Sequence, residues 1–124
     1  MVGIDIVLVS RVLDVLEHKK FYDKVLNSKE QEYILTKKQA SKMVEAKSIA
    51  GLYAAKEAVL KAFGVGITNG YGLKDVTIDH DELGKPIVLL SESLISLLNS
   101  MGKKSVNLSI SHDGDYATAI AILS

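Results

Sequence analysis

Residues 41–64 read SKMVEAKSIAGLYAAKEAVLKAFG, and this stretch predicts the longest helix of the chain. At about 100° per residue, Glu57 lies in the middle of its apolar stripe. The small or apolar residues within about 60° of Glu57 are Ala46, Ala50, Tyr53, Ala54, Leu60 and Gly64. Lys61 follows one turn later on the same side. Two opposite charges therefore point toward the packed side of the helix, where an unpaired charge would cost several kcal/mol.

The helix alone leaves two interpretations of this pair open. An i,i+4 Glu–Lys salt bridge at a helix edge is common and contributes only ~0.3–0.5 kcal/mol. A carboxylate held in an apolar setting is also typical of a functional site, where a partner or a ligand compensates its charge. The remaining segments of the chain must decide between the two.

The composition indicates one domain, residues 1–124, acting in the cytoplasm. The hydrophobic fraction is 48% and the mean hydropathy is +0.19, yet no apolar run is long enough to cross a bilayer. The absence of cysteine excludes disulfides, zinc–thiolate centres and cysteine nucleophiles, and it fits a reducing compartment. Any metal ion must therefore be held by oxygen or imidazole ligands, and no membrane partner is predicted.

The charges balance overall but are unevenly distributed. Residues 11–61 carry 11 Lys and Arg against 7 Asp and Glu, whereas the remainder carries 4 against 8. A basic half suits an acidic partner or a phosphorylated ligand. Nucleic acid is disfavoured because the excess is small and only 6% of the residues are aromatic.

The N-terminal third predicts a strand followed by short helices. Apolar residues over 2–9 indicate an opening strand with Asp5 in its interior, where aspartate is uncommon. Ser10 is a suitable cap for a helix ending near Leu16, with Arg11 turned outward. A short piece follows over 21–26.

Further helix boundaries are predicted by capping residues. Asn27 or Ser28 can begin a helix, with Glu30 or Gln31 in the capping-box position. The long helix is expected to end at Gly64, and the glycine-rich loop that follows matches neither a P-loop nor a dinucleotide fingerprint. Its backbone remains available to a phosphate group.

The C-terminal half predicts two hairpins separated by a helix. Residues 76–78 and 87–89 read as strands joined by a turn at Gly84. Ser91 is expected to cap a helix that Gly102 ends. Its expected inward residues are Leu94, Ile95, Leu97 and Leu98. The last hairpin spans 106–123, with His112 next to its turn. The order of elements favours an α+β fold, a mainly antiparallel sheet packed against one long and several short helices.

Asp5, Glu57 and His112 are the candidates for chemistry. Asp5 and Glu57 would make a pair of oxygen ligands of the kind that holds Mg²⁺ when substrate phosphates supply the remaining ligands. His112 lies between Ser111 and Asp113, where it is either a residue of an ordinary turn or a functional residue. A Ser-His-Asp triad is disfavoured because adjacent residues do not generally adopt triad geometry.

Four short blocks together resemble the holo-acyl-carrier-protein synthase family. They are GIDI at residues 3–6, AAKEA with KAFG at 54–64, LGKP at 83–86, and SISH with YA at 109–117. The resemblance runs almost end to end and implies a phosphopantetheinyl transferase fold and activity. The family moves the 4′-phosphopantetheine arm of coenzyme A onto a serine of apo acyl carrier protein and releases adenosine 3′,5′-bisphosphate.

The resemblance also implies roles for individual residues. Asp5 and Glu57 match the Mg²⁺ ligands, and Lys61 matches a lysine near the pyrophosphate. The residues implied on the coenzyme A side are Lys61, Gly64, Lys85, Pro86 and His112. Arg11 matches a basic residue that contacts the carrier protein. Glu57, or a water that it orients, could take the proton of the acceptor serine.

Three positions depart from the family pattern. Leu52 stands where arginine is common, Val65 stands in a usual Gly-Thr-Gly run, and Lys24 lies near an expected arginine. The missing guanidinium at position 52 should weaken one contact to a phosphate or to the carrier protein.

Other classes of function stay open at this point. The chain could be a non-catalytic module that binds coenzyme A or a nucleotide, a metal-dependent phosphohydrolase of the same ligand, or a scaffold in which Glu57 and Lys61 form only a salt bridge.

We expect the protein to form a homotrimer with its active sites at subunit boundaries. The final strand has alanines on one face and Thr118, Ile120 and Ile122 on the other, so neither face suits water. We expect the small alanines to let a neighbouring subunit approach closely. The number of subunits is taken from the resemblance.

Overall fold

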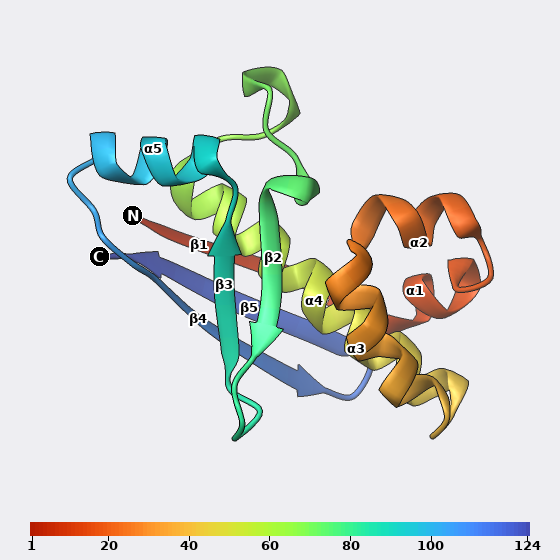
Figure 1. Cartoon of the computed structure of the whole chain (residues 1–124). Helices are drawn as coiled ribbons and strands as arrows, with labels where there is room; N and C mark the ends of the chain where they lie inside the picture. Colours follow the sequence, from red (N-terminus) through yellow and green to blue (C-terminus); the bar gives the residue numbers. More distant parts are fainter.

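The computed structural model describes all residues, 1–124, as two antiparallel sheets arranged around one long helix (Figure 1). The larger sheet has the strand order β1-β5-β4, with β1 (Val2–Leu8), β4 (Val106–Asp113) and β5 (Tyr116–Leu123). The smaller sheet is the hairpin β2 (Val76–His80) and β3 (Pro86–Leu90). Every strand pairing is antiparallel, which confirms the predicted α+β class.

Helix α4 (Lys42–Phe63) is the centre of the molecule. The other helices are α1 (Val9–Val15), α2 (Lys19–Val25), α3 (Ser28–Lys38), α5 (Glu92–Ser100) and the short 3₁₀ turns η1 (Ile67–Asn69) and η2 (Leu73–Asp75). Figure 1 shows α1, α2 and α3 gathered around the N-terminal half of α4, while α5 lies at the opposite end. None of these helices combines the length and the apolar character needed to span a bilayer.

The alanine face of β5 packs against α4 of the same chain. Ala117, Ala119 and Ala121 are each 2% exposed or less, because their small side chains let the helix lie close on the sheet. The expectation that these alanines receive a neighbouring subunit was therefore wrong. The opposite face of the sheet is the one left uncovered.

Strand β1 also lies directly on α4, and Gly3 makes this approach possible. A Cβ atom at Gly3 would collide with the carbonyl oxygen of Ala58 and lie 2.5 Å from the backbone nitrogen of Ala62. Asp5 is two residues farther along β1 and therefore faces the same helix. The contact between Gly3 and Ala58 thus brings Asp5 to the C-terminal half of α4.

Most predicted helix boundaries are confirmed. Asn27 accepts a hydrogen bond from the Glu30 backbone N–H, while the Glu30 carboxylate accepts one from the Asn27 N–H, which completes a capping box. Ser41 and Ser91 cap α4 and α5, and Gly64 ends α4 in the left-handed conformation with a φ angle of 74°.

Two local predictions were wrong. Ser10 does not cap the first helix, because α1 already begins at Val9 and Leu8 occupies the cap position without a side-chain hydrogen bond. On α5, Leu94 and Leu98 are buried but Ile95 is 45% exposed, because only one side of this helix meets the rest of the protein.

Candidate functional site

A hollow of about 790 Å³ lies beside the C-terminal half of α4. We call it the site hollow. Glu57 and Lys61 line it from α4, Lys24 from the end of α2, and Lys74 from η2. The glycine-rich segment 65–75 forms its outer wall, and the glycines at 66, 70 and 72 leave backbone without a covering side chain. The hollow therefore combines three lysines, two carboxylates and exposed backbone, and the second carboxylate, Asp75, accepts a hydrogen bond from the Gly72 N–H.

Lys61 joins α4 to β1 at the edge of this hollow. Its Nζ atom donates to Oδ1 of Asp5 at 2.8 Å and to the carbonyl oxygen of Ile4 at 3.2 Å. The Asp5 side chain is 17% exposed and that of Lys61 is 54% exposed. An i,i+4 bridge between Lys61 and Glu57, one of the two interpretations that the sequence left open, is not among the ion pairs of the chain. Lys61 thus pairs with the other predicted metal ligand.

Glu57 is half-buried and carries an unfavourable charge. Burial raises the pKa of its carboxyl, and the neighbouring charge of Asp5 raises it further, while Lys61 and Lys24 lower it. The same two carboxylates raise the pKa of Tyr53, although burial of the phenol is the larger cause. Two acids that repel each other in this way are a setting in which a bound cation would relieve the repulsion.

The protein itself supplies only some of the ligands that a Mg²⁺ ion needs. Asp5 and Glu57 supply the carboxylate oxygens that this ion prefers, and no group of three or more His, Asp or Glu side chains surrounds a possible metal position. A bound Mg²⁺ usually keeps several waters and takes other ligands from substrate phosphates. The two carboxylates beside three lysines fit that arrangement.

The fully buried charge on α4 belongs to Lys56, one residue before Glu57. Lys56 is 1% exposed and Glu30 of α3 is 0% exposed, and Lys56 Nζ lies 2.6 Å from Glu30 Oε1. Lys56 also donates to the carbonyl oxygen of Val25 at 2.7 Å, and Glu30 accepts from the Ile78 N–H at 2.8 Å. The sequence interpretation placed both Glu57 and Lys61 at the packed face of the helix. It was wrong for Lys61, whose side chain is 54% exposed, and it overlooked the buried pair of Lys56 and Glu30.

His112, near the end of β4, contacts the N-terminal half of α4, away from the site hollow. Its Nε2 atom is 2.9 Å from the carbonyl oxygen of Lys47, and its ring packs against Gly51. Gly51 precedes Glu57 by six residues, or about 9 Å along the helix axis. Within one chain, His112 does not line the site hollow that Glu57 lines.

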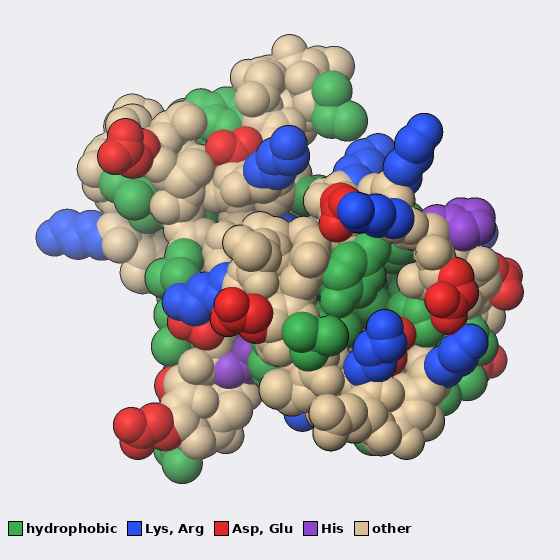
Figure 2. Space-filling view, turned by 45° about the vertical axis from the view of Figure 1, so that its right-hand side comes forward, with side chains coloured by type: hydrophobic (Ala, Val, Ile, Leu, Met, Phe, Trp, Pro, Cys, Tyr) green, Lys and Arg blue, Asp and Glu red, His purple; other side chains and the backbone are tan.

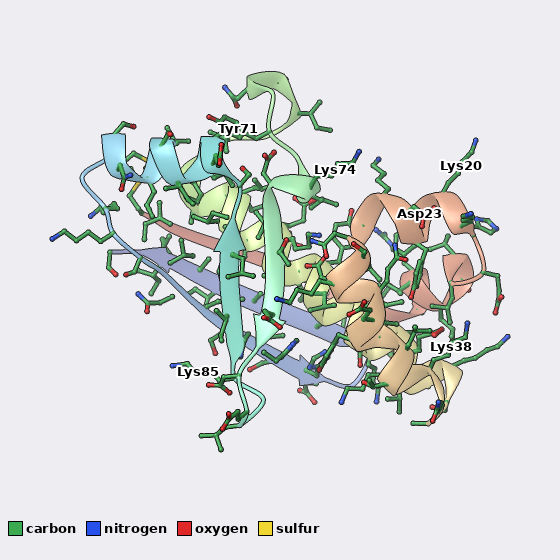
Figure 3. All side chains as sticks on the ribbon, viewed as in Figure 1. Lys20, Asp23, Lys38, Tyr71, Lys74 and Lys85 are labelled. Atoms are coloured by element: carbon green, nitrogen blue, oxygen red, sulfur yellow. The ribbon has the colours of Figure 1, made fainter.

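Lys85 and Pro86 are also remote from the site hollow in the single chain. They line a different groove of about 730 Å³ between β3, α5 and β4. Figure 3 shows Lys85 at the tip of the β2–β3 hairpin, at the opposite end from Tyr71 and Lys74. Gly64 ends α4 next to the site hollow, and Arg11 is exposed on α1. Only Asp5, Glu57, Lys61 and Gly64 are thus brought to one place.

Two basic residues of the site were missed by the sequence interpretation. Lys24 was noted only as a departure from a family pattern, and Lys74 was not singled out, yet both line the site hollow. The glycine-rich loop was the one signal that pointed toward this wall. Leu52 is 2% exposed within the core and does not reach the hollow.

The sequence model of the 4′-phosphopantetheinyl transferase superfamily matches residues 1–121. The chain belongs to this superfamily. It is 41% identical over 123 residues to the holo-[acyl-carrier-protein] synthase of Clostridium acetobutylicum, covering 98% of this chain and 94% of that protein. It is 38% identical over 121 residues to the enzyme of the same name from Treponema denticola, with 98% and 94% of the two chains covered. The resemblance found in the short blocks is confirmed.

A solved structure of this transferase superfamily has the same fold. The holo-[acyl-carrier-protein] synthase of Helicobacter pylori, crystallised in complex with coenzyme A, is 31% identical with a TM-score of 0.82, and the match covers 100% of both chains. The whole of this chain, including the segment around the site hollow, thus has a counterpart in that structure.

Proposed function

We propose that this chain transfers the 4′-phosphopantetheine group of coenzyme A to a serine of apo acyl carrier protein. The observation that carries the proposal is the convergence of Asp5, Glu57 and Lys61 beside a hollow lined by further lysines, in a chain of the phosphopantetheinyl transferase superfamily. The serine oxygen attacks the β-phosphorus, the bond to the adenosine bisphosphate breaks, and that group leaves. No covalent nucleophile from the protein is required.

Asp5 and Glu57 are proposed to hold Mg²⁺. When bound, the ion would neutralise charge on the pyrophosphate as the leaving group departs. The raised pKa of Glu57 agrees with a carboxylate that gains from a cation, and it also suits a group that accepts a proton from serine directly or through a water. Lys61 is held by Asp5 at the edge of the hollow, where its ammonium can face phosphate oxygens.

Lys24 and Lys74 are proposed to bind further phosphate oxygens. They approach the hollow from α2 and η2, on elements different from that of Lys61, so three positive charges surround one space. Fixed charges placed before the reaction stabilise the transition state without reorganising during it. This arrangement supports a phosphorylated substrate.

The carrier protein is proposed to dock on the side formed by α1–α3. Arg11 is exposed on α1, and Figure 2 shows Lys and Arg side chains interspersed with Asp and Glu on the side of the molecule turned forward there. Such a surface steers an acidic partner by local charge pairs instead of by one large basic patch. We place this reaction in the cytoplasm, as the cysteine-free composition predicts.

We also propose that the active form is a homotrimer with sites at subunit boundaries. The outer face of the larger sheet carries a contiguous apolar patch of Val2, Ile4, Ile6, Ile120 and Ile122, each between 39% and 63% exposed. Patches of this kind mark association surfaces. His112, Lys85 and Pro86 lie away from the site hollow of their own chain, and a neighbouring subunit could bring them to it.

Mass spectrometry of an apo acyl carrier protein tests the central proposal. The carrier is incubated with coenzyme A, this protein and either Mg²⁺ or a chelator, and it should gain the phosphopantetheine mass only with the metal. A known transferase acting on the same carrier is the positive control. Binding of coenzyme A without transfer would indicate a non-catalytic module, and cleavage of coenzyme A without carrier would indicate a phosphohydrolase. No metal-dependent binding at all would indicate a scaffold.

A further inference from the structure

A second hollow of about 330 Å³ lies among the helices at the other end of α4. We call it the helical hollow. It is bounded by the end of α1, by α2, by one face of α3 and by the first turn of α4, the four elements that gather at the right of Figure 1. It shares no lining residue with the site hollow, and the proposed transfer reaction makes no use of it.

Glu45 lines the helical hollow, and its carboxylate has no protein partner. The residue is 5% exposed and takes part in none of the four ion pairs. Its carboxylate accepts no hydrogen bond from the protein, and its oxygens keep some contact with solvent in the hollow, since no fully enclosed side-chain oxygen of the chain lacks a partner. Buried carboxylates are normally paired, because removing a charge from water is costly. The chain's other buried carboxylate, Glu30, obeys this rule, with Lys56 and two backbone N–H groups as donors.

The polar neighbours around Glu45 are engaged elsewhere or too distant. Glu17 is paired with Lys42 at 3.0 Å. The side-chain amide of Gln31 donates to the carbonyl oxygen of Leu26 at 2.9 Å and to Asp23 at 3.3 Å. Lys19 and Lys38 are exposed lining residues, and neither ammonium lies within 4.0 Å of Glu45. The hollow is therefore negative at its buried end and positive at its exposed edge.

The walls between these ends are suited to an aliphatic chain and a cation. Leu16 and Leu35 supply apolar surface, and Tyr22 supplies an aromatic ring. Burial raises the pKa of Tyr22, and the charge of Glu45 raises it further, so the phenol stays neutral and its ring remains attractive to a positive charge. A volume of this size is at the lower end of small-molecule sites.

We propose that the helical hollow binds a primary alkylammonium group, with Glu45 as its counter-ion and Leu16, Leu35 and Tyr22 around its carbon chain. The ammonium would supply the donors that Glu45 lacks, in charge-assisted hydrogen bonds. A second ammonium at the outer end would meet Lys19 and Lys38, so the site prefers monoamines to diamines. The group can belong to a free amine or to the lysine side chain of a partner protein.

An NMR titration of the full chain at pH 7 tests this inference. The probes are n-butylamine as a free monoamine, 1,4-diaminobutane as a diamine, and N-acetyl-lysine methylamide as a mimic of a protein side chain. Butylamine or the lysine derivative should give saturable shifts of the backbone amides of residues that line the helical hollow. The tighter of these two identifies the source of the group, and the diamine should bind more weakly than butylamine at matched ionic strength.

Two variants separate the role of Glu45 from general charge effects. Glu45→Gln keeps the shape and should weaken binding about tenfold or more, since it removes a charge-assisted contact. Glu17→Gln alters another lining carboxylate and should change affinity by less than about twofold, because an exposed pair contributes little. Leu35→Trp at a 55% exposed position fills the hollow while keeping Glu45, and it should abolish the shifts.

Saturable binding that Glu45→Gln leaves intact would overturn the proposal. So would the absence of shifts in the lining residues with both monoamine probes, which would mean that water alone solvates Glu45. Equal or tighter binding of the diamine would refute the assigned polarity of the hollow. Should Glu45→Gln fail to fold, the Leu35→Trp variant provides the same test by blocking the space.

Discussion

Lys61 Nζ lies 2.8 Å from Asp5 Oδ1, which joins the last turns of α4 to the interior of β1 across 56 residues of sequence. The hydrogen bond to Asp5 raises the pKa of Lys61. The bond depends on Gly3, since any larger side chain there would push β1 away from Ala58. This close packing of β1 on α4 thus lies beside the residues that carry the proposed chemistry.

Asp5→Asn should reduce phosphopantetheine transfer by about 100-fold or more while leaving the fold intact, because it removes a charged ligand and the partner of Lys61. Single-turnover transfer at saturating Mg²⁺, with circular dichroism to check folding, measures this. Glu92→Gln, at an exposed residue in the first turn of α5, is the matched control and should transfer at the normal rate. Near-normal turnover of Asp5→Asn would exclude Asp5 as a metal ligand.

Glu57 should make the metal-free protein less stable as the pH rises. Its pKa is raised in the folded protein above the ordinary value of 4.5, so between these two values the folded state binds more protons than the unfolded state. The free energy of unfolding therefore falls across this window and stays lower above it, relative to Glu57→Gln. Urea unfolding of both proteins from pH 4 to pH 8 in a chelator measures the difference.

Mg²⁺ should reduce that difference if Glu57 is a ligand, because binding to the folded state stabilises the wild type more than the variant. Parallel pH curves for the two proteins without metal would contradict the assigned effect of burial on Glu57. An equal shift of both proteins by Mg²⁺ would contradict its role as a ligand.

Lys56→Met should cost about 3–5 kcal/mol of stability, because it leaves the Glu30 carboxylate buried without its cation. Burial lowers the pKa of Lys56, whereas the hydrogen bond and the charge of Glu30 raise it. The charged form of Lys56 is therefore stabilised by Glu30. Lys29→Met breaks an exposed pair with Asp79 at 3.0 Å and should cost less than about 1 kcal/mol. Chemical denaturation of both variants measures their free energies of unfolding. A similar loss of stability in the two variants would contradict the role of the buried pair.

How far the sequence predicted this arrangement is clearest along α4. Periodicity predicted the helix and Gly64 predicted its C-terminal end, because these signals are local. Ser41 was read as the first helical residue, and it is the N-terminal cap. They could not distinguish Lys56 from Glu57 as the buried charge, since the partner Glu30 lies on α3 and its place depends on tertiary packing. Glu30 was predicted as a capping residue, and the same carboxylate also receives Lys56 and the Ile78 N–H.

The same reason explains the missed site residues. Lys24 ends α2 and Lys74 lies on η2, and only the path of the chain around α4 brings them to one hollow. For β5, the alternation of the side chains was read correctly. The element that covers the alanine face, α4, was not predicted, because an alternating pattern shows that a face is buried without showing what buries it.

Arg11→Glu should raise the KM for the carrier protein about tenfold at low salt and leave the KM for coenzyme A nearly unchanged, because reversing an exposed charge mainly alters encounter with an acidic partner. Lys104→Glu is the control. It reverses an exposed charge outside α1–α3, in the groove between β3, α5 and β4, and it should leave the KM for the carrier protein unchanged. Steady-state kinetics at two salt concentrations measure the effect. A carrier KM unaffected by Arg11→Glu at low salt would place the docking surface elsewhere.

Ile4→Arg should convert the proposed trimer to monomers. Ile4 pairs across the strands with Ile120, and the two are 63% and 39% exposed in the middle of the apolar patch on the outer face of the larger sheet. A charge there would be buried without a partner on association, at a cost of several kcal/mol, yet it is solvated in the free chain. Light scattering coupled to size exclusion reads the mass of each protein. Leu83→Arg, at a residue 95% exposed on the β2–β3 hairpin, should leave that mass unchanged.

Monomers of Ile4→Arg should also lose transfer activity, since His112, Lys85 and Pro86 do not reach the site hollow of their own chain. Mixing Ile4→Arg with a Glu57→Gln variant should not restore activity, because the first cannot associate and the second cannot catalyse. By contrast, mixing His112→Ala with Glu57→Gln should restore part of it if neighbouring subunits share a site. A wild-type protein of 13.4 kDa in solution with full activity would refute both the trimer and the shared site.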